Sequence, residues 1–356
     1  MMLQERGSLL GLVMLFCLPV NMVSAAVDTR ELDISLVVFD PGIPADPTHN
    51  KELGIFPKIR SAEARYLPFI LRQVLVDSNN WGAIRVIPDP DPGAELLITG
   101  RLLHSDGITL SFELTVKDSR GHTWLVKTYS GTAAETAYQN GRQSGPRPFQ
   151  ATYDEVLADL ARYAQTLEPK TLETIDNLAF LRYAATLSPD AFAPYFKQDE
   201  TGSYQLLRLP AYGDPMVSRI EKVREQEYVF VDTVDEQYRR MFAAMAPTYN
   251  LWRRYNREQA IYQEAYEERL AERSKPKHGS YQAMKRSYIN FRWSKIQQQE
   301  SAKLATGFNN EVAPTVMQLQ GRVVELEGNL EQQYREWRRI LQSIYQLEAT
   351  EQTFTR

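Results

Sequence analysis

The chain has 356 residues, of which 43% are hydrophobic and 24% charged, so it can bury a sizeable core and form two domains. Its formal net charge of −4 at pH 7 provides no basic field, which argues against nucleic acid as a partner. The single cysteine lies near the N-terminus, so the remainder of the chain offers no disulfide, no thiol nucleophile and no thiolate metal site.

Residues 1–26 have the pattern of a secretory signal peptide. A weakly positive start at Arg6 is followed by an apolar segment, residues 9–20, which is too short to cross about 30 Å of hydrocarbon. Small residues then predict cleavage near Ala25 or Ala26. The alternative is an uncleaved membrane anchor.

The same segment argues against a lipoprotein. Cys17 is preceded by Leu15 and Phe16, whereas a lipid-attachment site needs small residues there. An exported chain without cysteine after cleavage is compatible with a bacterial periplasm. We therefore expect a periplasmic or secreted protein that touches membranes only peripherally.

The first part of the mature chain alternates strand and helix signals. Residues 33–39 predict a strand that ends at an Asp-Pro-Gly turn. A helix is expected from Ser61, with Pro68 kinking or splitting it, and residues 83–87 predict a second strand.

The clearest β pattern follows, because apolar and polar residues alternate strictly over 108–117. With flanking strands at 96–104 and 123–129, joined by hairpin-type turns, this segment predicts an antiparallel meander. The apolar face of a helix over 149–167 should cover the sheet. Residues 27–168 are therefore expected to form one α/β domain.

Helix patterns dominate after Pro169. Residues 172–187 and 215–272 predict helices, the second bent or broken at Pro247. Between them lies a Gly- and Pro-rich loop with a short strand expected at 204–209. A breaker at 274–280 is the expected tip of a helical hairpin, and 281–306 is helical again.

Two heptad patterns suggest paired helices. One runs over 312–347 with a polar interruption at Gln333, and the other runs from Val234 to Tyr266. We expect the two to pair within the chain as an antiparallel hairpin or bundle, with Gln333 setting the register, although pairing between chains is the alternative. The expected fold class is α+β: a small N-terminal α/β domain with an antiparallel meander and covering helices, followed by an all-α domain of long helices, 169–356, forming a coiled-coil hairpin or bundle.

One constellation could bind a metal. His104 and His122 both belong to the meander, and with Asp106 they could ligate zinc if facing strands brought them together. Ordinary polar residues at strand ends are the preferred interpretation, because spacing specifies no third ligand. The sequence shows no phosphate loop, His-Glu-x-x-His motif or nucleophile elbow, so we predict no catalytic, cofactor or metal residues.

Aromatic residues on the helical patterns form a candidate interaction surface. Heptad spacing favours core packing for them, and stacking against a glycan is the minor alternative. Two arginines beside seam tryptophans suggest cation–π support. The candidate residues are Tyr238, Trp252, Tyr255, Tyr262, Tyr266, Trp337 and Arg338.

About a third of the chain resembles known envelope proteins. Residues 94–102, 108–133 and 152–163 resemble the N-terminal domain of the periplasmic translocation protein TolB and the related curli-secretion lipoprotein CsgG family, the matching positions being Ala94, Glu95, Gly100, Trp124, Tyr129, Ser130 and Gly131. The resemblance implies a fold and no activity. No propeller repeats, lipobox or pore-forming hairpin follow. The whole chain is similar to a group of exported bacterial proteins.

These observations favour a non-enzymatic periplasmic scaffold or adaptor. Its helical arm would self-associate or bind another protein of the cell envelope. The alternative is a glycan- or lipid-binding module that uses the groove between the two domains. An enzyme built on His104 and His122 is a third hypothesis.

Overall fold

The computed structural model describes most of the chain after the expected signal peptide. The described residues are 32–46, 50, 55–133, 148–272, 315–319 and 322–354. The signal peptide at 1–26, the breaker at 274–280 and the helix expected over 281–306 lie outside them.

A five-stranded mixed sheet is the centre of the first half, with strand order β2-β1-β3-β4-β5. β1 pairs in parallel with β2 and β3, while β3, β4 and β5 form the expected antiparallel meander. All five strands were predicted close to their observed bounds. These are β1 (Ile34–Val37), β2 (Ile84–Ile87), β3 (Leu96–Ser105), β4 (Thr109–Asp118) and β5 (Thr123–Thr132).

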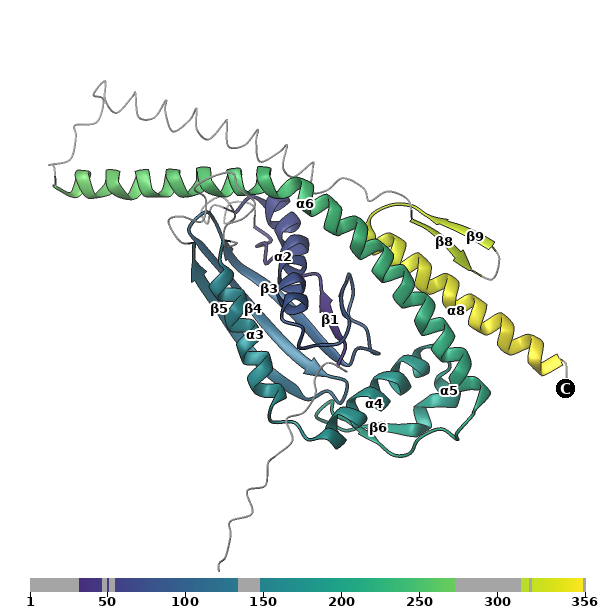
Figure 1. The fold of residues 1–356 in the computed structure, drawn as a ribbon. Coiled ribbons are helices and arrows are strands. Elements are labelled where there is room, and N and C mark those ends of the chain that lie inside the picture. Colours follow the sequence, from purple (N-terminus) through teal and green to yellow (C-terminus); the bar gives the residue numbers. More distant parts are fainter. Residues whose placement is uncertain are drawn as a thin grey trace, which may run out of the picture.

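Two helices, α2 (Pro57–Asp77) and α3 (Gln150–Ala164), cover one face of this sheet (Figure 1). The alternation in β4 explains why, since Phe112 and its apolar neighbours two residues apart are buried and the intervening residues are not. α2 begins at Pro57 rather than at Ser61, and Pro68 is buried inside it without dividing it, which corrects the expected break. Proline at the first helical position is favourable, because its missing N–H has no partner there anyway.

A smaller layer connects the sheet to the long helix. α4 (Pro169–Leu187) is followed by the short helices α5 (Pro189–Phe192) and η3 (Ala193–Tyr195). A two-stranded hairpin comes next, β6 (Phe196–Gln198) with β7 (Tyr204–Leu206), so the short strand expected at 204 is present.

The longest element is α6 (Pro215–Glu272), a helix of 58 residues and about 87 Å by its rise per residue. It continues through Pro247, so the expected break does not occur, although the helix changes direction along its length (Figure 1). Its first half runs beside the sheet and its second half extends past the ends of the strands.

The C-terminal heptad pattern does not form a single helix. Its first half is a hairpin of β8 (Thr315–Leu319) and β9 (Arg322–Leu326), and only the second half is helical, as α8 (Leu330–Phe354). Two features overrule the heptad spacing. The hairpin is rich in β-branched residues, which favour strands, and Asn329 starts α8 by exchanging hydrogen bonds with Gln332 in a capping arrangement.

α6 and α8 pack antiparallel within one chain, as expected, but through a different seam. The Arg219 Nη2 group donates to the Tyr345 carbonyl at 2.9 Å, while the Trp337 indole N–H donates to the Gln226 carbonyl at 3.3 Å. The described contacts of α8 with α6 therefore lie at the start of α6, before the pattern that runs from Val234 to Tyr266. Tyr238, in that pattern, instead packs on Phe69 of α2.

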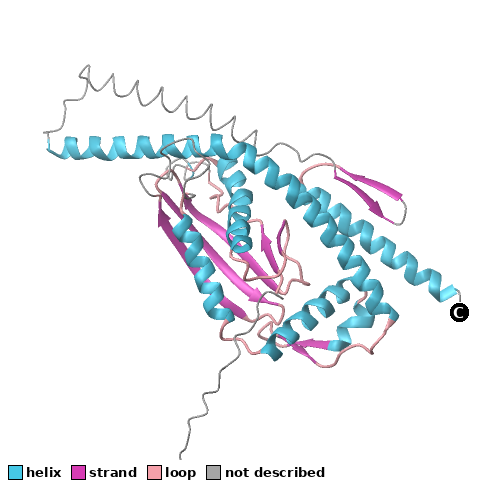
Figure 2. Cartoon of the chain, viewed as in Figure 1, coloured by secondary structure: helices cyan, strands magenta, loops and turns pink. Residues whose placement is uncertain are grey.

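One buried apolar cluster continues from the sheet into the helices. It includes residues of β1, β4, α4, α6 and α8, for example Leu36, Phe112, Ile175, Phe230 and Trp337. The protein is therefore mixed α/β, and a separate all-helical domain of coiled-coil type is not confirmed. Figure 2 shows the strands in three groups, the main sheet and two hairpins, between and beside the helices. No helix among the described residues has an apolar stretch long enough to cross a membrane.

Candidate functional site

The structure places three of the aromatic candidate residues inside the protein. Tyr238 stacks on Phe69 with ring centroids 5.4 Å apart, and Trp252 stacks on Tyr249 at 5.9 Å. Trp337 is fully buried against Phe230. These side chains are core residues, so they do not form an exposed interaction surface.

The remaining candidates divide into two groups. The side chains of Tyr255, Tyr262 and Tyr266 are outside what the structure describes, although their backbone belongs to α6. Arg338 is half-buried and reaches across to α6, where its Nε atom lies 3.3 Å from Oε1 of Glu227. Arg338 is therefore the one candidate that leads to a polar site.

Glu227 is a buried carboxylate held by two hydroxyl donors and an arginine. The Tyr183 hydroxyl donates to its Oε2 at 2.9 Å, and the Tyr334 hydroxyl donates to its Oε1 at 2.7 Å. Arg338 lies against the same oxygen and also donates from Nη2 to Asp91 at 3.4 Å. Helices α4, α6 and α8 and the loop after β2 thus meet at one carboxylate.

Burial raises the pKa of the Glu227 carboxyl above its ordinary value, against the attraction of Arg338 and the two hydroxyl donors. Burial also works to lower the pKa of Arg338, but Glu227, Tyr334 and Asp91 together outweigh it and the arginine pKa rises. The pair is desolvated, so removing one partner would leave the other uncompensated.

A cavity of about 230 Å³ opens beside this cluster. Its floor holds Tyr183, Glu227 and Leu341, which are buried, and its rim holds Thr186 and Gln342, which are exposed. A partly enclosed cavity with an apolar wall and a few convergent polar groups is the usual form of a small-molecule site. We take it as the candidate functional site.

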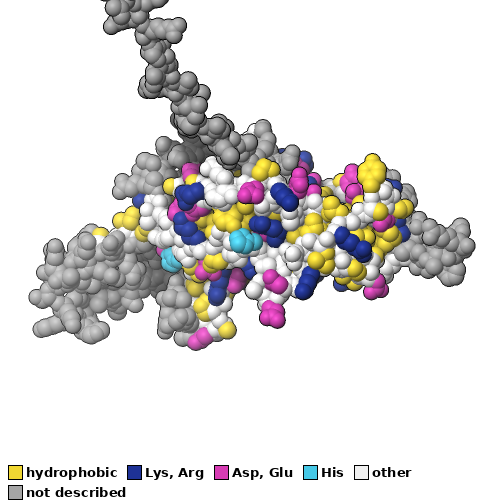
Figure 3. Space-filling model, turned by 90° about the horizontal axis from the view of Figure 1, so that it is seen from below, with side chains coloured by type: hydrophobic (Ala, Val, Ile, Leu, Met, Phe, Trp, Pro, Cys, Tyr) yellow, Lys and Arg dark blue, Asp and Glu magenta, His cyan; other side chains and the backbone are white. Residues whose placement is uncertain are grey.

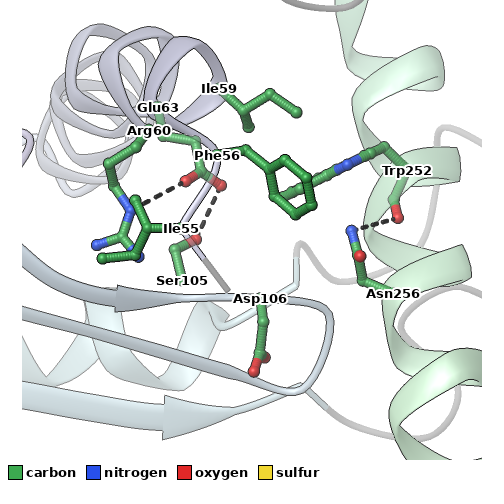
Figure 4. Close-up of a pocket in the computed structure, with 9 residues that line it drawn as sticks. All are labelled: Ile55, Phe56, Ile59, Arg60, Glu63, Ser105, Asp106, Trp252 and Asn256. Atoms are coloured by element: carbon green, nitrogen blue, oxygen red, sulfur yellow. Dashed lines mark hydrogen bonds and ion pairs between the residues drawn. The ribbon is translucent and has the colours of Figure 1, made fainter. Parts of the chain in front are cut away.

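A second buried polar cluster, centred on Glu63, joins α6 to the sheet. Arg253 donates to Glu63 at 3.0 Å, Tyr249 at 2.6 Å and Ser105 at 2.8 Å. Figure 4 shows Glu63 and Ser105 turned toward one another while the Asp106 carboxylate points away. The adjoining cavity is only about 40 Å³.

The tip of the β3–β4 hairpin fixes this second cluster against α6. Arg253 donates from Nη1 to the Asp106 carbonyl at 2.8 Å, and a Cβ added at Gly107 would meet the Arg253 carbonyl oxygen at 2.2 Å. Such close backbone approach requires glycine. The cluster fills its space with ion pairs and hydrogen bonds, so we assign it to holding α6 in place.

His104 and His122 do not come together. They lie at opposite ends of β4, because His104 pairs with Ser111 while His122 follows the strand at Asp118, roughly 20 Å away by the rise of a strand. His104 Nε2 is instead 2.8 Å from Asp106. Burial works to raise the pKa of Asp106, but the hydrogen bonds from His104 and two backbone N–H groups outweigh it and lower that pKa to about 2.

Sequence reasoning missed Glu227, which shares its stretch of α6 with two other carboxylates, Glu221 and Glu225. The latter two are exposed, but Glu227 lies on the buried stripe of α6 between Val223 and Phe230. The sequence contained a signal of this burial, because Glu227 is four residues after Val223 and three before Phe230, which places all three on one helix face. A carboxylate at such a position is buried and needs partners.

Among the described residues, no group of three or more His, Cys, Asp or Glu side chains is placed to hold a metal ion. On the face in Figure 3, Lys and Arg side chains are interspersed with Asp and Glu rather than gathered in one region. This face carries no basic field of the kind that nucleic acid requires.

We compared the chain with known proteins in three ways. No protein-family model matches it, and neither a curated protein nor a solved structure is significantly similar to it. The resemblance to the TolB N-terminal domain and the CsgG family therefore stays a prediction from the residues quoted above.

Proposed function

We propose that the protein is a non-enzymatic adaptor or scaffold of the bacterial cell envelope. It is exported by the segment 1–26, and it binds a partner protein through the part of the chain from 169 to 356, which in this proposal acts as a helical unit separate from the sheet domain. Three residues of the aromatic stripe are buried, so we expect the partner protein to bind another surface. They are Tyr238, Trp252 and Trp337.

The observation that carries the proposal is an exposed apolar segment between β7 and α6. Leu207, Leu209 and Tyr212 are 55%, 53% and 108% exposed. Three large apolar side chains within six residues exceed the scattered exposure that is normal on a soluble surface.

This segment is anchored at both ends. The N–H groups of Leu207 and Arg208 both donate to the Tyr195 carbonyl, at 2.9 and 3.3 Å. At the other end Asp214 accepts from the Met216 N–H at 2.9 Å and caps the start of α6. A segment held in this way presents its apolar side chains at a lower ordering cost than a free loop.

A photocrosslinking amino acid at Tyr212 tests the proposal in cells. We expect one discrete adduct with a partner protein in the envelope fraction, lost when Leu207→Ser and Leu209→Ser are combined. The matched control carries the crosslinker at Val126, which is 61% exposed on β5. Equal adducts from both positions, or none from Tyr212, would contradict the proposal.

A second candidate function is a glycan- or lipid-binding module that uses the groove between the two domains. One observation favours it: the cavity at Glu227 is lined by the loop before β3 and by α4, α6 and α8. A binding module and an adaptor are compatible, since the cavity and the exposed segment involve different residues.

A further inference from the structure

The cavity at Glu227 is assembled from four segments that are distant in sequence. Pro92 comes from the loop before β3, Tyr183 from α4, Glu227 from α6, and Arg338 and Leu341 from α8. Gly93 closes the loop against α4, because a Cβ there would meet the Tyr183 side chain at 2.7 Å. The site exists only when all four segments are in place.

Arg338 retains hydrogen-bonding capacity at this cavity. A guanidinium has five N–H donors on three nitrogens. Nε faces Glu227 and Nη2 faces Asp91, but no described residue accepts a hydrogen bond from Nη1. Arg338 lines the cavity with its side chain 27% exposed, so a ligand oxygen can accept from it.

The charges at the cavity do not favour an ionic ligand. Two carboxylates, Glu227 and Asp91, flank the single guanidinium of Arg338, so there is no positive surplus for an anion. A cation would meet the Arg338 guanidinium, because Asp91 does not line the cavity and both oxygens of Glu227 already accept hydrogen bonds from tyrosine hydroxyls. Neutral hydroxyl groups meet neither penalty. They can accept from Arg338 and exchange hydrogen bonds with the Gln342 amide, and they can donate to the Thr186 hydroxyl, whose own proton goes to the Tyr183 carbonyl.

Size and wall chemistry limit the ligand further. A volume of about 230 Å³ is larger than the cavity of about 150 Å³ that holds a benzene ring, and it suits a single substituted ring. Pro92, Leu187 and Leu341 supply an apolar wall. An acyl chain is disfavoured, since it would cover the Arg338 guanidinium without accepting a hydrogen bond from it.

We propose that this cavity binds one neutral sugar ring of a glycan, with its hydroxyl groups on Arg338, Thr186 and Gln342 and its apolar face on Leu187 and Leu341. The inference rests on the second candidate function, for which it specifies the ligand class and the residues. It is independent of the adaptor role of the exposed segment.

The test uses saturation-transfer NMR and calorimetry on the full-length mature protein. The probes are glucose, N-acetylglucosamine and N,N′-diacetylchitobiose at millimolar concentration, with hexanoate as an apolar anion. Gln342→Trp fills the rim of the cavity, and Gln342→Ala leaves it open. The matched control is Ser343→Trp, one residue further along the exposed side of α8, where the hydroxyl donates to the Arg339 carbonyl of its own helix.

We expect saturable binding of at least one neutral sugar, weakened about tenfold or more by Gln342→Trp, weakened less by Gln342→Ala, which removes one hydrogen-bonding group and leaves the cavity open, and retained in Ser343→Trp. If no sugar binds, or hexanoate binds instead, both the inference and the glycan-binding function are overturned. Should a sugar bind equally well to Gln342→Trp, the inferred site is wrong while the glycan-binding function stands. Thermal unfolding of each variant verifies that it is folded.

Discussion

Arg253 and Glu63 are 190 positions apart and form an ion pair of 3.0 Å in which each side chain is only 2% exposed. Tyr249 and Ser105 donate to the same Glu63 oxygen, so the carboxylate is well supplied with donors. This pair joins α6 to α2 and to the β3–β4 hairpin. It lies near the bend of α6 and gives the long helix a fixed orientation on the sheet.

Breaking this pair from one side should be costly. We expect Arg253→Met to lower the free energy of unfolding by about 3 kcal/mol, because Glu63 would lose its nearer cation at 3.0 Å and keep only Arg60 at 4.0 Å in a desolvated place. Urea unfolding followed by circular dichroism measures the change. The double variant Arg253→Met/Glu63→Gln should lose less than the sum of the two single variants.

The exposed pair of Arg239 and Glu236 on α6 is the matched control. These side chains are 61% and 39% exposed, so Arg239→Met should cost less than about 1 kcal/mol. If Arg253→Met lost as little stability as Arg239→Met, the buried pair would not be what holds α6 on the sheet.

Gln333 connects the second hairpin to α8. Its Oε1 atom accepts from the Thr315 hydroxyl at 2.6 Å, and its amide donates to the Gly328 carbonyl at 3.0 Å. Gln333→Leu leaves that buried hydroxyl without its acceptor, at a cost of about 1 to 3 kcal/mol. We expect faster hydrogen exchange over 315–326.

Replacing both partners is the control for this prediction. In Gln333→Leu/Thr315→Val no buried polar side chain is left unpaired, so most of the exchange protection should return. Equal exchange in the single and double variants would mean that the hydrogen bond does not hold the hairpin in place.

Gln333 also shows where sequence reasoning succeeded and failed. Its interruption of an apolar pattern marked it correctly as a special position, but the pattern was assigned to one helix. The heptad positions at Val316 and Val323 are also compatible with two separate strands. Their β-branched side chains favour strands, so the segment forms a hairpin and not a helix. Strict alternation in β4 allowed no second interpretation, so the meander was predicted from sequence.

The cavity could not be predicted in the same way. It depends on Pro92, Tyr183, Glu227 and Arg338, which come from four segments whose proximity follows only from tertiary packing. Arg338 was selected for its neighbour Trp337 and not for the carboxylate that it contacts. Residue spacing along a chain identifies one helix face, but it does not identify which other elements that face will meet.

Stability should fall as the pH rises from about 5 to about 7. Burial raises the pKa of Glu95 to about 7, against the hydrogen bond that the Asp33 N–H donates to it, and burial raises the pKa of Asp235 to about 7 against the attraction of Arg72. Between their unfolded pKa values and pH 7, both carboxyls are protonated in the folded state and ionised in the unfolded one. Raising the pH therefore favours unfolding.

Glu95→Gln removes one of these titrations and keeps a hydrogen-bond acceptor for Asp33. Relative to the unmutated protein, we expect it to gain stability at pH 7.5, by at most about 3 kcal/mol, and to show a smaller slope of stability against pH. Denaturant unfolding at a series of pH values measures both. Glu113→Gln, at an exposed position on β4, is the control and should leave the slope unchanged.

Trp337 lies in the core, whereas the sequence placed it in a candidate interaction surface. It is fully buried, its ring lies 5.6 Å from that of Phe230, and its N–H donates to the Gln226 carbonyl. We expect Trp337→Ala to lower the free energy of unfolding by about 3 to 5 kcal/mol, while Trp337→Phe loses less because most of the apolar volume remains. The crosslinking yield from Tyr212 should be unchanged in Trp337→Phe, since the folded surface is the same. A Trp337→Phe protein that keeps its stability but loses the adduct would return Trp337 to the interaction surface and contradict its assignment to the core.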